Sequence, residues 1–237
     1  KDGMLKVWEI RTARLRHTLS EHWATIHGIV ALPTRSEFIS VSEDHTMRVW
    51  DYVTGKLKRT LGKSSPIQSL SVAADGRHAY VGVRRAVEAW DLETGKLVRS
   101  FEVGTDVARV VAVTRDGSRV LSGGGDGTVR VWDTSNARQL FAIRAHRRDI
   151  WDLALLSDDR HAVTASADGS LQLVDIRQGI KVCRLKGHRT EVLAVAVHGS
   201  RAISGSSDRT LVYWDLAHGR RLRRLEGHQN VIDDVAI

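Results

Sequence analysis

Histidine, serine and aspartate residues recur together in this chain at nearly constant spacing. Such a trio can act as a hydrolase triad, in which a histidine within hydrogen-bond reach of a nucleophilic serine is oriented by the aspartate. It can equally form a buried hydrogen-bonded chain that only joins neighbouring segments. The two complete trios are His22, Ser40 and Asp44, and His188, Ser204 and Asp208.

Each trio is followed by a Trp-Asp pair, and that pair also recurs. "EDHTMRVWDY" begins at Glu43, and "SDRTLVYWDL" begins at Ser207. Repeat architectures copy one unit at a fixed period, whereas active sites are usually single, so this recurrence favours a scaffold. The tryptophan or its replacement stands at Trp8, Trp50, Trp90, Trp132, Val174 and Trp214, in steps of 42, 40, 42, 42 and 40 residues.

Each unit is predicted to hold four short strands. Runs of β-branched or alternating residues separated by Gly, Ser, Asp or His are typical of strands and are too short for ordinary helices. The chain has only 2 prolines, so few strand positions lack a backbone donor. The fold class is therefore all-β, and in one unit the predicted strands are 192–197, 202–206, 211–214 and 221–225.

These features resemble those of the WD-repeat β-propeller family. Its marks are a Gly-His pair before the first strand, an Asp in the turn between the second and third strands, and the terminal Trp-Asp. Gly-His stands at 187–188 and 227–228, with weaker versions at 21–22 and 145–146. The resemblance covers almost the whole chain and implies four-stranded antiparallel blades, seven in a full ring. Nucleotide-binding signalling ATPases and kinases that carry WD repeats resemble this arrangement.

One WD-repeat domain is expected over residues 1–237, incomplete at both ends. The first unit contains a turn and a third strand but no first or second strand, and the last unit supplies only a first strand. About five complete blades plus partial ones are therefore expected, within a larger multidomain protein. The predicted repeats are 1–20, 21–61, 62–102, 103–144, 145–186, 187–226 and 227–237.

The resemblance implies a structural role for the trios, as a buried chain that ties the entering loop, the second strand and the turn together. The set is incomplete in several units: Val174 replaces Trp, Gly104 stands in the His position, and Lys63 and Arg84 take the His and Asp positions before Trp90. A redundant structural device can be lost unit by unit, whereas a catalytic one cannot, so the chain is predicted not to be an enzyme. The predicted staple residues are His22, Ser40, Asp44, Trp50, Ser122, Asp126, Trp132, His146, Thr164, Asp168, His188, Ser204, Asp208 and Trp214.

The resemblance also implies a partner-binding face, because family members often bind at the narrower face of the ring. Trp151 is a candidate anchor with Arg147, Arg148 and Asp149 as a polar rim, although a partly buried packing role is an equal alternative, and Trp23 is a weaker candidate. Mixed charges and an aromatic residue suit a protein or peptide partner. The predicted face residues are Thr25, His27, Glu43, Gln68, Arg109, Asp149, Trp151, Glu191, Leu193 and Asp233.

A formal charge of +8 and a pI near 10 allow a nucleic-acid partner instead. The basic residues concentrate in predicted fourth strands such as "KLKRTL" and "RRLRRL". Lys and Arg on an outer edge strand discourage edge-to-edge aggregation, so much of the charge has a structural explanation. Nucleic-acid binding is therefore the alternative, and protein binding the leading hypothesis.

Other chemistry finds little support. "SGGGDGT" from Ser122 falls on a repeated turn and lacks the Gly-Lys-Ser/Thr of a phosphate loop. The 11 histidines show no paired metal spacing, and Cys183 is the only cysteine, so no metal, cofactor or disulfide is predicted. No apolar run is long enough to span a membrane, and a cytoplasmic location is expected. An enzyme with a site in the central channel stays open as a second alternative, which converging inward acids would favour.

Overall fold

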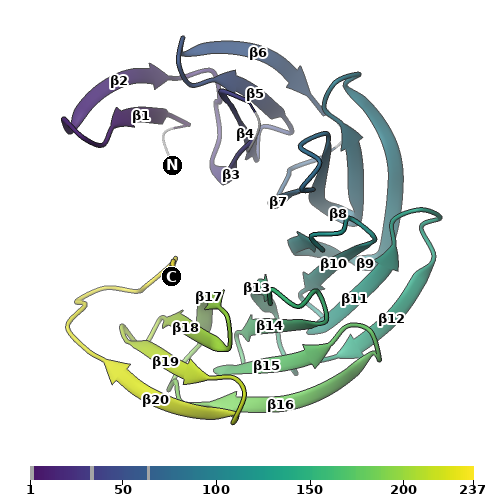
Figure 1. The fold of residues 1–237 in the computed structure, drawn as a ribbon, viewed down its shortest axis with the longest axis vertical. Coiled ribbons are helices and arrows are strands. Elements are labelled where there is room, and N and C mark those ends of the chain that lie inside the picture. Colours follow the sequence, from purple (N-terminus) through teal and green to yellow (C-terminus); the bar gives the residue numbers. More distant parts are fainter. Residues whose placement is uncertain (1–2, 33–34, 63–64) are drawn as a thin grey trace.

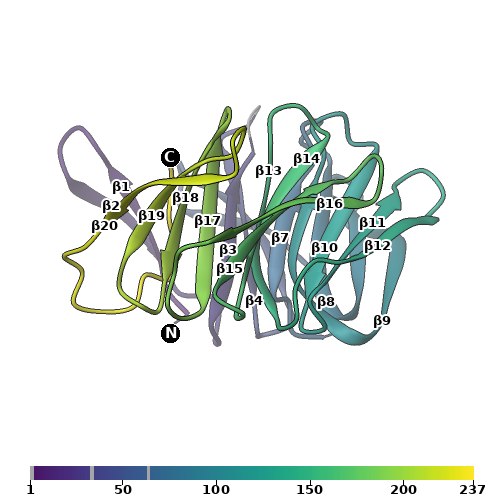
Figure 2. The same cartoon turned by 90° about the horizontal axis from the view of Figure 1, so that it is seen from below.

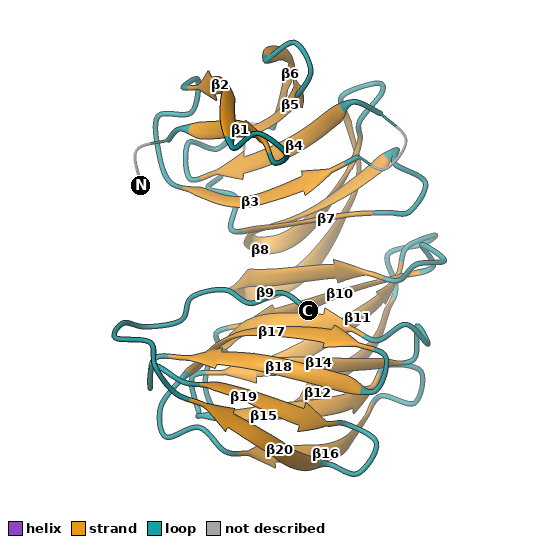
Figure 3. Ribbon diagram, turned by 60° about the vertical axis from the view of Figure 1, so that its left-hand side comes forward, coloured by secondary structure: helices purple, strands orange, loops and turns teal. Residues whose placement is uncertain are grey.

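The computed structural model describes residues 3–32, 35–62 and 65–237, and of residues 105 and 106 only the backbone. These residues form 20 strands and no helix, so none of them belongs to a helix that could cross a membrane (Figure 3). The strands are β1 (Leu5–Glu9), β2 (Arg14–Leu19), β3 (Ile26–Ala31), β4 (Glu37–Ser42), β5 (Met47–Asp51), β6 (Lys56–Leu61), β7 (Ser69–Val72), β8 (His78–Asp91), β9 (Lys96–Val113), β10 (Arg119–Gly124), β11 (Thr128–Asp133), β12 (Gln139–Arg144), β13 (Ile150–Leu155), β14 (His161–Ser166), β15 (Ser170–Asp175), β16 (Ile180–Lys186), β17 (Val192–His198), β18 (Arg201–Ser206), β19 (Leu211–Asp215) and β20 (Arg220–Leu225).

The repeating unit is a sheet of four antiparallel strands in chain order. β3–β6, β13–β16 and β17–β20 are such sheets, and β1 pairs only with β2. Seen down the short axis, the units follow one another around an arc, with each first strand inside and each fourth strand outside (Figure 1). The arc stays open between β1–β2 and β20. The predicted fold of four-stranded propeller blades is therefore confirmed, with five four-stranded units and no closed ring.

Two of these units share a six-stranded sheet of β7 to β12. β8 contains both the second and the third strand of its unit. The Leu92 N–H donates to Arg77 O at 2.8 Å, which shows that the two halves of β8 form a hairpin. The equivalent bond, from Leu216 N–H to Ser200 O, closes the second hairpin of the last four-stranded unit at 2.9 Å. The turn is short and centres on Arg85, whose φ is 72°. β9 then continues from the outer edge of this unit into the first strand of the next, pairing with β8 and with β10.

The tryptophans of the third strands occupy equivalent positions, as predicted. Trp50 pairs with Leu57, Trp90 with Leu97, and Trp214 with Arg221, each seven residues later and each directly after a register shift. Trp50, Trp132 and Trp214 are each 1% exposed, because each packs between its own sheet and residues of the preceding unit.

In the five four-stranded units, an aspartate ends the third strand and binds the turn that follows it. Asp91 Oδ1 accepts the N–H groups of Glu93 at 2.9 Å and Thr94 at 2.8 Å, and Oδ2 accepts from Arg77 Nε at 2.9 Å. The bond from Thr94, then that from Arg77, holds the pKa of the Asp91 carboxyl well below its usual range. Gly95 completes the turn at a φ of 70°, which glycine adopts without strain. The recurring Asp-x-x-x-Gly is thus the signal that turns the third strand into the fourth.

The hydrophobic core lies largely between neighbouring units. One cluster joins Leu171 and Leu185 of one sheet to Val195 and Val212 of the next. A sheet with two apolar faces is stable only when both faces are covered, so stacking the units side by side buries a continuous core.

The last residues differ from their prediction. Residues 226–237 form no strand, although they carry the pattern of a first strand. Ile232 N–H donates to Ser206 O at 3.3 Å, and the Ile232 side chain is 7% exposed. Ile232 and Val235 lie against Gly205 of β18 in the preceding unit, but a strand also requires a neighbour that completes its ladder, and no strand of the described residues follows this segment.

Candidate functional site

The histidines and turn aspartates of the predicted trios lie at one face of the arc, together with the predicted partner-binding residues. Because consecutive strands are antiparallel, the connections from fourth to first strand and from second to third strand meet at one end of each sheet. We call this end the His–Asp face, since it carries His22, His146 and His188 with Asp44, Asp168 and Asp208. The other two kinds of connection form the opposite face (Figure 2).

The first trio is a continuous hydrogen-bonded chain. His22 Nδ1 lies 2.7 Å from Asp44 Oδ2, and His22 Nε2 lies 2.7 Å from Ser40 Oγ. Trp50 Nε1–H donates to the same Ser40 Oγ at 2.8 Å. Since the carboxylate can only accept, His22 Nδ1 carries the proton, and Ser40 donates its own to Nε2. Every polar atom of the chain therefore has a partner.

In this hydrogen-bonded chain, the histidine at the centre is neutral and the aspartate at the end is charged. Burial lowers the pKa of His22, although the bond to Asp44 opposes the shift. Burial raises the pKa of Asp44, but the hydrogen bonds from Thr46 and His22 outweigh it, so that pKa is lowered. His22 is thus a neutral imidazole bound to an ionised carboxylate near pH 7.

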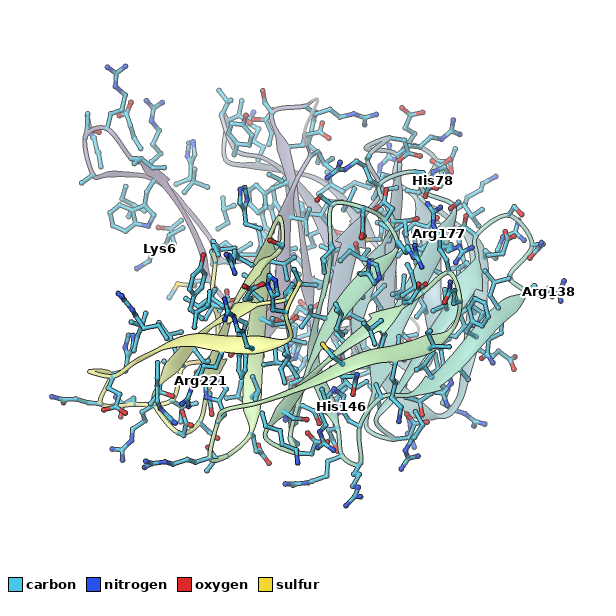
Figure 4. All side chains as sticks on the ribbon, turned by 60° about the horizontal axis from the view of Figure 1, so that its bottom comes forward. Lys6, His78, Arg138, His146, Arg177 and Arg221 are labelled. Carbon is cyan, nitrogen blue, oxygen red and sulfur yellow. The ribbon has the colours of Figure 1, made fainter. Side chains whose placement is uncertain are left out.

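The two other trios repeat this geometry with one variation. His188 Nε2 lies 2.7 Å from Ser204 Oγ, which accepts Trp214 Nε1–H at 2.8 Å. In the unit 145–186 the hydroxyl belongs to Thr164, 2.8 Å from His146 Nε2, and Val174 fills the tryptophan position. Both histidines lie 3.2 Å from the nearer oxygen of their aspartates, and burial lowers the pKa of each. Figure 4 places His146 at the end of its sheet.

Two units lack the hydrogen-bonded chain of His, Ser or Thr, and Asp. In the unit 103–144, Ser122 and Trp132 are buried, and Asp126 binds Arg130 Nη2 at 2.7 Å in the absence of a histidine. In the unit 62–102, the Trp90 indole donates instead to Glu88 at 3.0 Å, and Arg84 is exposed in the Asp position. Lys63 lies outside the described residues.

Two partners of the turn aspartates escaped sequence reasoning. A hydroxyl two residues later binds the carboxylate: Thr46 Oγ1 donates to Asp44 and Ser170 Oγ to Asp168, each at 2.5 Å. The repeated Asp-x-Thr/Ser of "EDHT", "GDGT", "ADGS" and "SDRT" carries this signal. Fourth-strand arginines also reach the turn, with Arg184 Nη2 at 2.9 Å from Asp168. Arg224 and Asp208 make the same contact at the same separation of 16 residues, and that repeated spacing is its signal in the sequence.

The trios have the distances of a catalytic triad without its accessibility. Ser40 and Ser204 are 0% exposed, and the Oγ of each is occupied by an indole N–H as well as by histidine. A nucleophile must reach its substrate, which these hydroxyls cannot do without unfolding. The arrangement suits a structural tie. The described residues also contain no group of three or more His, Cys, Asp or Glu that could hold a metal ion.

The predicted face residues five positions after the His position of each unit share a structural cause, and in the unit of Arg109 the His position is Gly104. β13 pairs Ile150 with Ser166 and then Asp152 with Ala165, so Trp151 is the extra residue of a β-bulge. Leu193, His27 and Arg109 sit in the same bulge of their own first strands. A bulge re-aims the side chain of its extra residue, which explains why this repeat position turns toward the face.

The residues three positions after each histidine are tied to the turn before the aspartate. Thr25 O accepts Glu43 N–H at 2.9 Å, and Asp149 O accepts Ala167 N–H at 3.0 Å. Glu191 O accepts Ser207 N–H at 3.1 Å. The two kinds of connection on the His–Asp face therefore lie beside each other in every intact unit.

Three of the predicted face residues meet across two units. Arg109 Nη2 lies 3.1 Å from Asp149 Oδ2, and its guanidinium carbon lies 4.8 Å from the centre of the Trp151 ring. Trp151 Nε1 and Arg109 Nε are buried without a hydrogen-bond partner among the described residues. The half-buried indole packs against a cation and keeps an unsatisfied donor.

The remaining face residues are more scattered. His27 Nε2 lies 3.0 Å from Glu43 Oε1, and Arg148 Nη2 lies 3.3 Å from Glu191 Oε1. Gln68 bonds to Gly82 through its backbone, and Asp233 is exposed in the terminal segment.

Asp152 is a half-buried acid that sequence reasoning missed. Its Oδ1 accepts Leu153 N–H at 2.8 Å, and its Oδ2 accepts Val195 N–H of the next unit at 2.7 Å. Burial, partly opposed by these two bonds, raises the pKa of Asp152 to about 6. Its carboxyl joins two units, and the nearby charge of Asp234 adds to the rise of its pKa.

Many basic residues of the outer strands have structural partners. Arg224 Nη2 donates to Asp208 at 2.7 Å, Arg59 Nη1 donates to Leu92 O at 2.9 Å, and Lys58 Nζ donates to Glu37 at 2.5 Å. These contacts fix side chains along the rim, so part of the positive charge serves the fold.

Family models match most of the chain. A model of the NWD2 C-terminal beta-propeller matches residues 62–186, which is more than half of the chain. A model of the WD domain, G-beta repeat, matches residues 13–51 and 179–215.

Several curated proteins are similar in sequence. Autophagy-related protein 16 of Arabidopsis thaliana is 27% identical over 201 residues, which cover 82% of this chain and 40% of that protein. Cilia- and flagella-associated protein 52 of Chlamydomonas reinhardtii is 28% identical over 178 residues, 73% of this chain and 29% of the relative. Protein groucho of Drosophila melanogaster is 30% identical over 147 residues, 58% of this chain and 20% of the relative. The chain thus spans well under half the length of these relatives.

Proposed function

The chain belongs to the WD-repeat β-propeller family, and on that basis we propose that it is a non-catalytic protein-interaction module whose partner binds the His–Asp face. A propeller is a rigid support, so its function must come from side chains at the ends of its strands. The bulge in successive first strands presents such side chains at equal intervals.

The cluster of Arg109, Asp149 and Trp151 carries this proposal. The Trp151 side chain is only half-buried, and the Arg109 guanidinium 4.8 Å from its ring centre holds it in place, so it offers a partner a fixed aromatic surface. Aromatic and arginine side chains are also the commonest anchors of protein interfaces, and Asp149 supplies a hydrogen-bond acceptor beside them.

A larger, regulatory protein of the cytoplasm is the proposed context. The matched segments cover only 20% to 40% of the relatives named above, which supports further domains. A signalling role follows the resemblance to ATPases and kinases that carry WD repeats.

Trp151→Ala tests the binding face. We expect this substitution to weaken binding of a partner by about 2 kcal/mol, which is about a 30-fold loss of affinity. The measurement is quantitative mass spectrometry of proteins captured from cells by the wild type and the variant, followed by titration of the recovered partner. Tyr52→Ala is the matched control, because Tyr52 is an exposed aromatic residue on the opposite face.

Two outcomes would contradict the proposal. If Trp151→Ala lowers the melting temperature and leaves the affinity of the folded fraction unchanged, Trp151 is a packing residue. If both variants lose the same proteins, the contact does not depend on the His–Asp face.

A further inference from the structure

A groove of about 550 Å³ opens on the His–Asp face between the units 145–186 and 187–226. It lies among the loop after His146, the loop after His188 and the turn at Asp168. Its lining includes four arginines, Arg147, Arg148, Arg184 and Arg189, and the carboxylates of Asp168 and Glu191. Four guanidinium groups face two carboxylates, so the groove has an excess of two positive charges.

Two of these guanidinium groups are held by the protein itself. Arg184 donates through Nη2 to Asp168 at 2.9 Å and through Nε to Ser170 Oγ at 3.0 Å. Arg148 donates through Nη1 to Ala167 O at 3.0 Å and pairs with Glu191 at 3.3 Å. These contacts fix two cations along the groove, each already partly neutralised.

The other two guanidinium groups are free. Arg147 and Arg189 are exposed, and no carboxylate of the described residues lies within ion-pair distance of either guanidinium. Their backbones are nevertheless fixed, because Arg147 N–H donates to Asp168 at 3.3 Å and Arg189 N–H to Asp208 at 2.9 Å. Each free cation therefore projects from an anchored residue.

The two free arginines occupy the same repeat position in adjacent units. Arg147 and Arg189 each follow directly after the histidine of their units, where Trp23 and Gln229 stand in two other units. The scaffold needs only the backbone N–H of this position, so its side chain is free to vary. Arginine in two adjacent units concentrates charge at one groove. Below His146, long nitrogen-tipped side chains extend beyond the ribbon (Figure 4).

We propose that this groove binds the phosphate of a phosphorylated serine or threonine in the partner segment that the proposed function places on the His–Asp face. A phosphate monoester carries nearly two negative charges at pH 7, which matches the two free cations. Planar guanidinium groups bind its oxygens in pairs with favourable geometry. Thr190 and Gly169 complete the wall.

A nucleic-acid backbone fits this groove less well. A duplex presents one charge about every 1.7 Å of its axis and needs an extended cationic track. Here Glu191 lines the groove and Asp149 lies beside it, bonded through its backbone O to Ala167 of the groove wall, so that their carboxylates would repel neighbouring phosphates. A single phosphate group within a peptide meets the cations without meeting this acidic border.

A peptide library with a fixed central phosphoserine or phosphothreonine and degenerate flanks tests the inference. The immobilised library, its unphosphorylated twin, a single-stranded oligonucleotide and phosphoinositide vesicles are compared for retention of the purified chain. We expect retention on the phosphorylated library alone. Replacing Arg147 and Arg189 together by Gln should lower it by about tenfold or more.

The matched control replaces Arg138 and Arg177 by Gln, which removes the same charge from exposed arginines on the opposite face (Figure 4). Equal loss in both double variants, or retention that ignores phosphate, would overturn the inference, and so would stronger binding to the oligonucleotide or the vesicles. This inference rests on the proposed function, but the two fail separately. If Trp151→Ala still weakens a partner whose binding needs no phosphate, only the groove assignment is lost.

Discussion

At the scale of single residues, the trios show how catalytic residue types can serve a structural purpose. The bond lengths of Ser40, His22 and Asp44 match those of a nucleophile, a base and its orienting acid. Their burial and the Trp50 indole favour a structural role, because the hydroxyl has no free direction from which a substrate could approach. The tie links residues 16 to 22 positions apart, so each trio fixes the loop that enters its unit.

His188→Ala is expected to destabilise the fold by about 1–3 kcal/mol, because it leaves Ser204 and Asp208 without a buried partner. Thermal unfolding measures this, with about 2–4 °C expected for each kcal/mol. His228→Ala is the control, since His228 has the same repeat position but is exposed. Equal melting temperatures for the wild type and the His188 variant would rule out the structural tie.

At the scale of elements, contacts between first strands join the units near the inner side of the arc. Asp152 at the start of β13 accepts the Val195 N–H of β17. Asp234 has the same place in the terminal segment, where its Oδ1 accepts Val235 N–H at 2.8 Å. The bulge that presents Trp151 thus also places an acid between two units.

Asp152 gives a specific pH dependence. Its folded pKa of about 6 lies above the ordinary value of 3.8, so the folded state holds the proton more tightly than the unfolded state. Its contribution to stability is therefore largest below about pH 4 and is lost as the pH rises to about 6. The Asp152→Asn variant has no carboxyl at this position, so it should not lose this stability as the pH rises. The melting temperature of the variant minus that of the wild type should rise between pH 4 and 6 and stay constant above about pH 7.

Taking the difference between the two proteins removes the contribution of the buried histidines, whose lowered pKa values act in the opposite direction. A difference that stays flat from pH 4 to 7 would show that the Asp152 carboxyl titrates normally.

At the scale of the whole molecule, the net charge of +8 can serve either the fold or a nucleic-acid partner. The outer strands carry much of it around the rim, and several of their cations bind acids or carbonyls of the fold. A rim of this kind keeps edge strands from pairing with other molecules, whereas a nucleic-acid site requires charges that are free and gathered on one side.

A triple variant distinguishes the two roles of the positive charge. It replaces Arg220, Arg221 and Arg223 together by Gln. All three are exposed on β20, and we expect unchanged folding and unchanged partner affinity. Arg224→Gln is the contrasting variant: it should lower stability by about 1–3 kcal/mol, because Arg224 binds Asp208 and Gly187 O. If duplex DNA binds tightly and the triple variant reduces the slope of log affinity against log salt by about three, nucleic acid is the ligand.

The repeat, the strands and the composition of the buried trios follow from the sequence by itself. The strands at 192–225 were predicted to within one residue of β17–β20, because hairpins are local and their turn residues are visible in the chain. The positions of His22, Ser40, Asp44 and Trp50 were likewise readable, since all four lie within one unit whose geometry the turns fix.

Only the tertiary structure decided which units meet and how. Arg109 reaches Asp149 and Trp151, and Asp152 reaches Val195, across the boundary between stacked sheets about one repeat apart in the chain. No local spacing specifies such contacts, because they depend on how far one twisted sheet is offset from the next. The strand-like residues 226–237 make the same point: their pattern is that of a first strand, but a strand forms only where a neighbour supplies the other half of its ladder.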